Sequence, residues 1–194
     1  MRLPSDATLL VIDVQRAIDD PKWGQRNNPQ AERAVAEVIA AWRAAGLPLV
    51  HVRHDSVEPA SPYQPGGPGH AFKPEALPQP GETVLGKSTT SAFVGTDLET
   101  MLTAAGRTTL VVCGVLTHNS VEATVRHAGD LGFRVFVIAD ACAAVDKRDL
   151  AGRLWAAEDV HALSLAHMDG QYATIVDSVT ACEAARIVAA RRRR

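Results

Sequence analysis

Short apolar runs that return along the chain are the feature of this sequence that most constrains its fold. The two clearest are Thr8–Val14 and Thr108–Val115, which are rich in β-branched residues and leucine. Runs this short are typical of strands, and strands that are apolar on both faces are typical of the centre of a covered parallel sheet. Four further segments are predicted to be strands: 48–53, 83–86, 134–139 and 172–176.

Segments with helical spacing of apolar residues lie between these runs. They cover residues 29–45, 96–105, 119–131 and 150–166, with a last helix from about residue 178. Val35, Val38 and Trp42 recur at helical intervals in the first of them, and Gly46 ends the pattern. Strands that alternate with helices predict βαβ units. We therefore expect an α/β, three-layer, doubly wound fold with a six-stranded, mostly parallel sheet and helices on both faces.

Length and charge limit the classes of protein that this chain can belong to. The 194 residues contain no internal repeat, so we expect a single domain over residues 1–194. Lys and Arg total 20 against 22 Asp and Glu, a net charge of −2, which argues against a nucleic-acid partner. The one basic run, Arg191–Arg194, is interpreted as a solvated tail.

Three further properties bear on where the protein works. The chain has three cysteines, too few and too odd in number for a disulfide framework. No apolar stretch approaches the length of a membrane span. The N-terminus lacks the apolar core of a signal peptide. We therefore expect a cytoplasmic protein with no membrane partner.

One long irregular segment interrupts the alternation of strands and helices. It covers about residues 55–82, and residues 55–81 contain seven prolines and four glycines. Loops of this length inside a compact domain are usually lids or binding loops. We therefore expect it to form part of a ligand-binding site.

Polar residues follow three of the predicted strands. Asp13 ends the first, Lys87 ends the third, and residues 114–121 form a turn that presents Ser120 at a helix N-terminus. Doubly wound sheets bind ligands at the carboxyl ends of strands, where the strand order reverses. An aspartate there can act as a general base, a lysine can stabilise negative charge, and turn amides can form an oxyanion hole. Taken singly, Asp13 is equally well explained as a loop tether, and Lys87 as a solvated surface residue.

The order of these motifs resembles the isochorismatase-like hydrolase superfamily over roughly residues 8–176. The resemblance rests on the run from Leu10 to Gln15, on Lys87 with Ser91–Phe93 behind it, and on the spaced residues from Gly114 to Ala128. The segments Ile138–Ala141 and His161–Leu163 fit the same pattern.

The resemblance implies a fold, an oligomeric state and an activity. It implies sheet order 3-2-1-4-5-6, a homo-oligomer (dimer or tetramer), no cofactor, and hydrolysis of C–N bonds in small amides, ureides or carbamoyl compounds. Asp13 matches the family's base, and Lys87 matches the lysine that holds that carboxylate. A cis peptide is implied between Val115 and Leu116. The oxyanion hole is expected from the backbone amides of Leu116, Thr117 and Ser120.

Ser120 is the departure from the family pattern, because the family has a nucleophilic cysteine at this position. An alkoxide is far harder to generate than a thiolate, so a site tuned for sulfur is expected to lose rate with oxygen. Three interpretations stay open. Ser120 is an introduced substitution, or a natural and specially activated nucleophile, or part of a vinyl-ether hydrolase in which Asp13 acts as general acid without a nucleophile. A binding protein without catalysis is a further alternative.

Residues expected near the mouth of the crevice are candidate substrate contacts, although core packing or loop anchoring explains them equally well. They are Gln15, Trp23, His54, Phe72, Phe93, His118 and Asn119. His51, His54 and Asp55 are of the residue types that bind zinc. The two histidines are predicted to point to opposite faces of one strand, so we expect no metal site.

Overall fold

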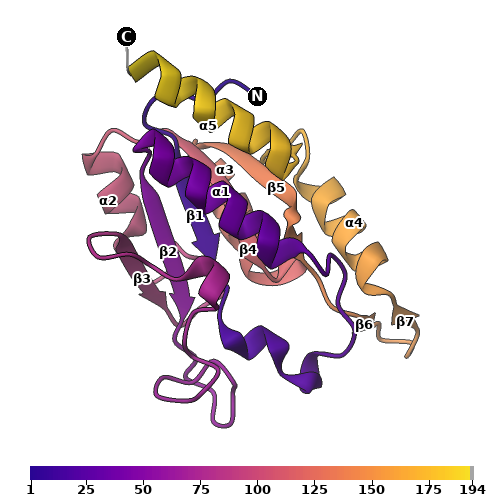
Figure 1. The fold of residues 1–194 in the computed structure, drawn as a ribbon. Helices are drawn as coiled ribbons and strands as arrows, with labels where there is room; N and C mark the ends of the chain where they lie inside the picture. Colours follow the sequence, from indigo (N-terminus) through magenta and orange to yellow (C-terminus); the bar gives the residue numbers. More distant parts are fainter. Residues whose placement is uncertain (193–194) are drawn as a thin grey trace.

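The structure, a computed structural model, describes residues 1–192, and its centre is one six-stranded parallel sheet (Figure 1). The order is β3-β2-β1-β4-β5-β8, and every neighbouring pair is parallel. Since β8 is the sixth strand of this sheet, the expected order 3-2-1-4-5-6 is confirmed. The strands are β1 (Thr8–Ile12), β2 (Leu49–His54), β3 (Thr83–Lys87), β4 (Thr109–Val115), β5 (Arg134–Ala143) and β8 (Thr174–Val176).

Helices cover both faces of this sheet, as expected. The two longest, α1 and α5, pack against each other on one face, while α3 and α4 pack on the other (Figure 1). The buried side of α1 includes Val38 and Trp42, and Gly46 ends it in the left-handed conformation. The helices are α1 (Ala31–Ala45), α2 (Leu98–Ala104), α3 (Glu122–Asp130), α4 (Ala157–Met168) and α5 (Ser178–Arg192).

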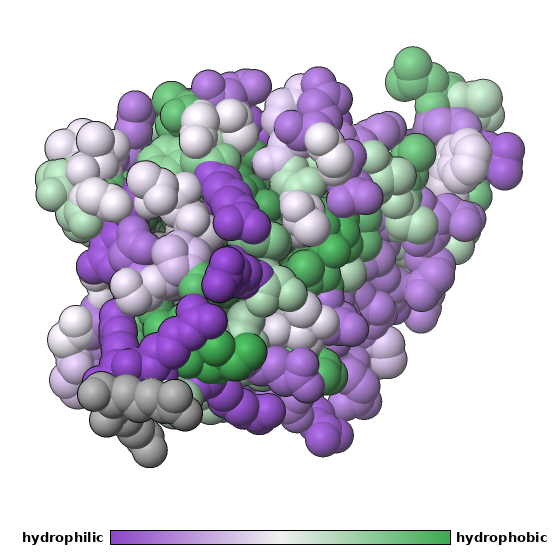
Figure 2. Space-filling model, turned by 90° about the horizontal axis from the view of Figure 1, so that it is seen from above, coloured by the Kyte–Doolittle hydropathy of each residue, from purple (hydrophilic) through white to green (hydrophobic). Residues whose placement is uncertain are grey.

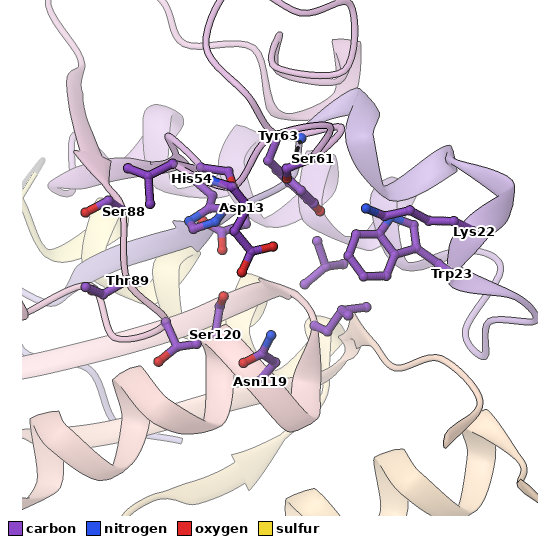
Figure 3. Close-up of a pocket in the computed structure, with 16 residues that line it drawn as sticks. Asp13, Lys22, Trp23, His54, Ser61, Tyr63, Ser88, Thr89, Asn119 and Ser120 are labelled. Atoms are coloured by element: carbon purple, nitrogen blue, oxygen red, sulfur yellow. Dashed lines mark hydrogen bonds between the residues drawn. The ribbon is translucent and has the colours of Figure 1, made fainter. Parts of the chain in front are cut away.

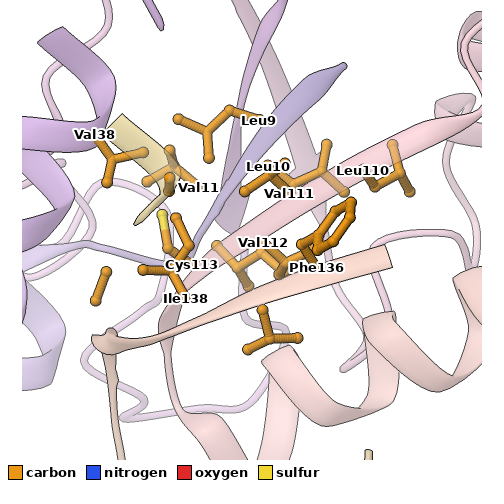
Figure 4. Close-up of a cluster of buried hydrophobic side chains, with 14 of the residues drawn as sticks. Leu9, Leu10, Val11, Val38, Leu110, Val111, Val112, Cys113, Phe136 and Ile138 are labelled. Carbon is orange, nitrogen blue, oxygen red and sulfur yellow. The ribbon is translucent and has the colours of Figure 1, made fainter. Parts of the chain in front are cut away.

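The main hydrophobic core lies on the two central strands. Every residue of β1 and of β4 is buried, which explains why both sequences are apolar on both faces. Figure 4 shows side chains of β1 and β4 clustered with Val38 of α1 and with Phe136 and Ile138 of the neighbouring strand β5. Burying an apolar side chain of this size stabilises the fold by about 1.5–3 kcal/mol. The carboxyl ends of β1 and β4 are therefore held at fixed positions.

The predicted helix over residues 150–166 begins too early. Residues 147–155 instead form a hairpin of β6 (Lys147–Arg148) and β7 (Leu154–Trp155), and α4 starts at Ala157. The Asp149 carboxylate accepts hydrogen bonds from two backbone amides of the turn and from the Trp155 indole. These side-chain bonds favour a turn over a helix.

Two other boundaries also differ from the prediction. The strand predicted at 134–139 continues as β5 to Ala143, past the exposed Asp140, which accepts two hydrogen bonds from Ser178. The helix predicted from residue 119 begins at Glu122 as α3, and a single π-helical turn, Thr117–Val121, stands before it. The expected cis peptide between Val115 and Leu116 is present.

The N-terminal segment and the end of α5 at Arg192 lie side by side at the end of the molecule seen in Figure 2, where hydrophilic and hydrophobic side chains are intermixed. Arg191 and Arg192 belong to α5, and the Arg192 guanidinium donates hydrogen bonds to the carbonyls of Ala45 and Gly46. Arg191 and Arg192 are both exposed at the end of α5, so the interpretation of Arg191–Arg194 as a solvated tail on the last helix stays a prediction, and Arg193 and Arg194 lie outside the described residues. Within residues 1–192, no helix combines the length and apolar character needed to cross a membrane.

The proline- and glycine-rich segment runs along the carboxyl ends of β1 and β2. Its second half is tied to the chain after β1, because the amides of Arg16 and Ala17 donate to the carbonyls of Ala71 and Gly69. The short 3-10 helices Arg16–Asp19 and Pro21–Trp23 follow β1 on the same side, and a third, Pro74–Ala76, lies within the segment. This arrangement encloses the space beyond the strand ends.

Candidate active site

Asp13 occupies an unusual backbone position immediately after β1. Its φ of 54° lies in the left-handed region, which residues other than glycine rarely adopt. Backbone hydrogen bonds hold this conformation, since the Asp13 amide donates to the Val52 carbonyl at 2.9 Å and the Asp13 carbonyl accepts from Gln15 at 2.8 Å. Such conformations cluster at functional sites.

Lys87, the last residue of β3, joins Asp13 to the turn that carries Ser120. Its ammonium nitrogen lies 2.7 Å from Asp13 Oδ2, 3.3 Å from Ser120 Oγ and 3.0 Å from the Thr89 carbonyl oxygen. The lysine side chain is fully buried and that of Asp13 is 5% exposed. Burial raises the pKa of Asp13, and the neighbouring Lys87 ammonium opposes that rise. The second carboxylate oxygen, Oδ1, is buried without a hydrogen-bond partner among the described residues.

Gly114 allows β4 to approach β1 closely beside this group. Its φ is 126°, and a Cβ built there would lie 2.1 Å from the Ile12 carbonyl oxygen. The register between β4 and β5 also shifts here, between Val112 and Gly114. Only glycine fits this position, and it brings the turn after β4 next to Asp13.

The π-helical turn Thr117–Val121 presents Ser120 to Lys87. Within it, the amides of Asn119 and Val121 both donate to the Leu116 carbonyl, at 3.0 and 3.2 Å. The Thr124 hydroxyl donates to the Ser120 carbonyl at 2.7 Å. Ser120 is buried, yet it lies on the surface of a pocket.

This pocket has a volume of about 310 Å³ and opens at the carboxyl ends of the strands (Figure 3). Asp13 and Ser120 face each other on one side of it, and Trp23 and Lys22 lie on another. The lining residues are Asp13, Lys22, Trp23, His54, Ser56, Val57, Glu58, Ser61, Tyr63, Ser88, Thr89, Thr90, Val115, Leu116, Asn119 and Ser120.

Three rings make an aromatic wall opposite the turn. Tyr63 packs edge-on against Trp23 and His54, with ring centroids 6.1 and 5.5 Å apart. The Trp23 indole donates a hydrogen bond to the Ala17 carbonyl at 2.7 Å, which fixes its ring. Burial and the nearby Lys87 lower the pKa of His54, so this imidazole is neutral at neutral pH.

The structure separates the candidate substrate contacts into two groups. Trp23, His54 and Asn119 line the pocket together with Asp13 and Ser120. Lys87, the third candidate catalytic residue, lies beneath the pocket surface and contacts Asp13. The other four candidates, Gln15, Phe72, Phe93 and His118, do not line it.

Each of these four has another place in the fold. Gln15 is fully buried and hydrogen bonds to the backbone of His54 and to the carbonyl of His70. Phe72 packs on His51, and Phe93 packs on His127. His118 faces a different cavity, against the β6–β7 hairpin. The expectation that they line the crevice is therefore wrong, and Gln15 instead anchors the loop.

Tyr63 and the hydroxyl-bearing residues at 56, 61 and 88–90 also line the pocket, and none of them was predicted from the sequence. Tyr63 is one of two aromatic residues in the long loop, and an aromatic residue in a binding loop is a signal for ligand contact that the sequence offered. The serines and threonines offered none, because such residues are common in every loop. Among residues 1–192, no group of three or more His, Cys, Asp or Glu side chains is arranged to hold a metal ion.

Comparison with known proteins shows the family of this chain. The isochorismatase domain matches residues 7–179, and the chain therefore belongs to the isochorismatase family of hydrolases. A solved isochorismatase-family protein from Chromobacterium violaceum is 56% identical, with a TM-score of 0.94 over 96% of this chain and 97% of that one.

Two curated relatives extend the comparison. The isochorismatase family protein YrdC of Bacillus subtilis is 38% identical over 87% of this chain and 90% of its own length. The ureidoacrylate amidohydrolase RutB of Methylobacterium radiotolerans is 31% identical over 71% of this chain and 67% of its own length.

Proposed function

We propose that this protein hydrolyses the C–N bond of a small amide, ureide or carbamoyl compound. The observation that carries the proposal is the contact of Lys87 Nζ with both Asp13 Oδ2 and Ser120 Oγ at the edge of an enclosed pocket. A carboxylate, a cation and a hydroxyl in this arrangement are the parts of an acyl-transfer site. The amidohydrolase RutB is a relative with C–N chemistry in its name.

In the first half of the proposed reaction, Ser120 Oγ attacks the substrate carbonyl carbon. Its proton passes to the Asp13 carboxylate, and Lys87 Nζ stabilises the negative charge that develops on Oγ. Asp13 then gives that proton to the leaving nitrogen as the C–N bond breaks, which leaves an acyl ester on Ser120. Asp13 Oδ1, which has no partner in the described residues, is free to accept a proton in such a step.

In the second half, water attacks the ester carbon and Asp13 takes its proton. The acid leaves, and the proton returns to Ser120 Oγ. Backbone amides of Leu116, Thr117 and Ser120 are proposed to bind the carbonyl oxygen, while the amides of Asn119 and Val121 donate to the Leu116 carbonyl. The raised pKa of Asp13 suits it to both proton transfers.

The pocket sets a limit on the substrate. Its volume of about 310 Å³ accommodates a small molecule but not a peptide chain. The wall formed by Trp23 and Tyr63 favours a substrate with a planar or apolar part beside the scissile group.

Ammonia or amine release from a panel of small amides, ureides and carbamoyl compounds tests the proposal. The protein, its Ser120→Cys variant and its Asp13→Asn variant are compared. We expect turnover of at least one compound by the protein or by Ser120→Cys, with the thiol form faster because a thiolate forms more readily than an alkoxide. Asp13→Asn is expected to be inactive on the same compound.

Three other results would contradict the proposal. If neither the protein nor Ser120→Cys releases ammonia or amine from any compound, and pyruvate is released from isochorismate, the protein is a vinyl-ether hydrolase. Tight binding of a compound without turnover by either form would indicate a binding protein. Full activity of Asp13→Asn would show that the site is wrongly assigned.

A further inference from the structure

Thr117 is held at two points by one helix on the far side of the active-site turn. It is the first residue of the π-helical turn and is fully buried. Its hydroxyl lies 2.8 Å from His161 Nδ1, and its carbonyl oxygen accepts a hydrogen bond from the Ser164 hydroxyl at 3.2 Å. Both partners lie in α4, three residues apart, and therefore on the same face of that helix.

The hydrogen bonds of Asn28 determine which ring nitrogen of His161 carries the proton. The Asn28 side-chain nitrogen donates to the carbonyls of Cys142 and Ala139 at 2.7 and 3.1 Å, and it lies 3.4 Å from His161 Nε2. A nitrogen that donates to two carbonyls is an amide NH₂, which cannot accept a proton from His161 Nε2, so the tautomer without a proton on Nε2 is favoured. The proton then sits on Nδ1 and is donated to the Thr117 hydroxyl.

The proposed reaction gives His161 and Ser164 no role. His161 and Ser164 are buried and neither lines the pocket. Burial lowers the pKa of His161, so it is neutral at neutral pH and the tautomer above is available. The single proton of the Ser164 hydroxyl is shared between the Thr117 carbonyl and the nearer Glu122 Oε2 at 2.5 Å, so Ser164 links Thr117 to the first residue of α3.

We propose that His161 and Ser164 are positioning residues that set the distance between Ser120 and Lys87 by fixing Thr117. This inference concerns the proposed active site and rests on the role given there to Ser120. Lys87 is fixed from the opposite side by Asp13 and by the Thr89 carbonyl. The 3.3 Å contact of Lys87 Nζ with Ser120 Oγ therefore depends on where the turn sits. A displaced turn weakens that contact, because charge-assisted hydrogen bonds need short distances.

A thiol at position 120 reports this distance without any substrate. In the Ser120→Cys background, the rate of alkylation by iodoacetamide is measured against pH, and the modified peptide is quantified by mass spectrometry. The midpoint gives the thiol pKa, which a nearby lysine lowers. The three native cysteines are buried, and fragmentation of the tryptic peptide 108–126 distinguishes position 120 from Cys113, which lies on the same peptide.

Thr117→Val in this background removes the hydroxyl but keeps the branched shape. We expect the thiol pKa to rise by about one unit, which slows alkylation by about tenfold at pH values below both midpoints. Thr117→Ser is the matched control and is expected to leave the pKa unchanged. His161→Ala is expected to raise the thiol pKa as Thr117→Val does. The double variant is expected to raise it little further, because the two single changes remove the same contact.

His161→Asn and Leu163→Ala complete the set. The asparagine retains a donor close to the place of Nδ1 and is expected to restore part of the shift, while Leu163 is exposed on α4 and its truncation is expected to have no effect. Ser164→Ala releases the Thr117 carbonyl together with the Glu122 carboxylate, and it is the second test of the tether if the other variants do not fold.

The proposal is overturned if the folded Thr117→Val, His161→Ala and Ser164→Ala variants keep the thiol pKa of the background, even with reduced thermal stability. That result would make the contacts structural only. Since the assay uses no substrate, the proposal can succeed while the amide panel fails, and the reverse result is equally recognisable.

Discussion

The pocket has two walls that the chain builds in different ways. The catalytic wall comes from the ends of three parallel strands, where Asp13, Lys87 and Ser120 meet within hydrogen-bond distances and Lys87 is fully buried. The opposite wall comes from residues 56–63 of the long loop and from Trp23. Most backbone hydrogen bonds of that loop tip are local, such as Ser56 to Tyr63 and Ser61 to Glu58.

This difference separates the chemistry from its selectivity. Any change on the catalytic wall affects a buried ion pair and strands packed into the core, so its consequences are large. The loop wall contacts the rest mainly through side chains, and Val57 is 77% exposed. Changes there alter what binds while the sheet stays intact, which is the usual division between scaffold and binding loop.

Asp13→Asn is the change with the largest expected effect. The amide retains the shape and one acceptor for Lys87, but it cannot take a proton. We expect activity on the best panel substrate to fall by about 10³-fold or more, as for loss of a general base. The measurement is steady-state ammonia release, with circular dichroism to show that the variant folds. Activity within tenfold of the parent would mean that another group accepts the proton.

Lys87→Met tests the cation on the same wall at nearly constant side-chain length. We expect kcat to fall by about 10²-fold with a much smaller change in KM, because the charge acts on the developing negative charge of the nucleophile. An uncompensated Asp13 is left behind in a buried place, so unfolding by urea is measured beside the kinetics. A rise in KM with unchanged kcat would instead make Lys87 a substrate-binding residue.

The catalytic wall was also the part of the site that the sequence predicted best. Asp13 and Lys87 stand at the ends of runs whose strand character follows from composition, and parallel strands place such ends at one edge. Ser120 was found through the turn after the strongest strand. The left-handed φ of Asp13 and the close approach at Gly114 were not predicted, because both arise from contacts with neighbouring strands.

The loop wall was predicted poorly for a physical reason. A proline- and glycine-rich segment has no periodicity, so its path depends on tethers such as the buried Gln15, which looked like a substrate contact. Phe93 was misplaced in the same way, since an aromatic residue near a strand end packs equally well on His127. The hairpin before α4 was missed because the Asp149 turn is stabilised by side-chain and backbone hydrogen bonds that leave no periodic signal in the sequence.

Trp23→Ala tests the loop wall and is expected to have an intermediate effect. It removes the ring that packs on Tyr63 and one side of the pocket. We expect KM to rise by about tenfold with kcat changed by less than threefold, in keeping with loss of binding common to substrate and transition state. Tyr63→Phe is the matched control, since it keeps the ring packing. A selective fall in kcat would place Trp23 in the chemistry and would break the distinction between the two walls.

The smallest predicted effect lies where the long loop rejoins the sheet, at Glu82. Its carboxylate accepts two hydrogen bonds from Arg43 and one from the Gln79 amide, and it also contacts His51. The hydrogen bonds from Arg43 are the main reason that the pKa of Glu82 is lowered to about 2. A carboxylate whose pKa is depressed in the folded state stabilises the fold above its unfolded pKa, and that contribution is lost as the pH falls towards the folded value.

Glu82→Gln is therefore expected to lower the free energy of unfolding at pH 7 by about 1–2 kcal/mol, allowing for partial solvent screening. The difference between the two proteins should shrink as the pH falls from about 4.5 towards 2, because the parent carboxylate is then protonated as well. Urea unfolding at pH 7, 4 and 3 measures it, and kcat and KM at pH 7 should stay within twofold. A difference that is independent of pH would show that Glu82 acts through packing alone. A large change in KM would show that Glu82 and the pocket wall at residues 56–63 move together. The long loop would then be one rigid unit.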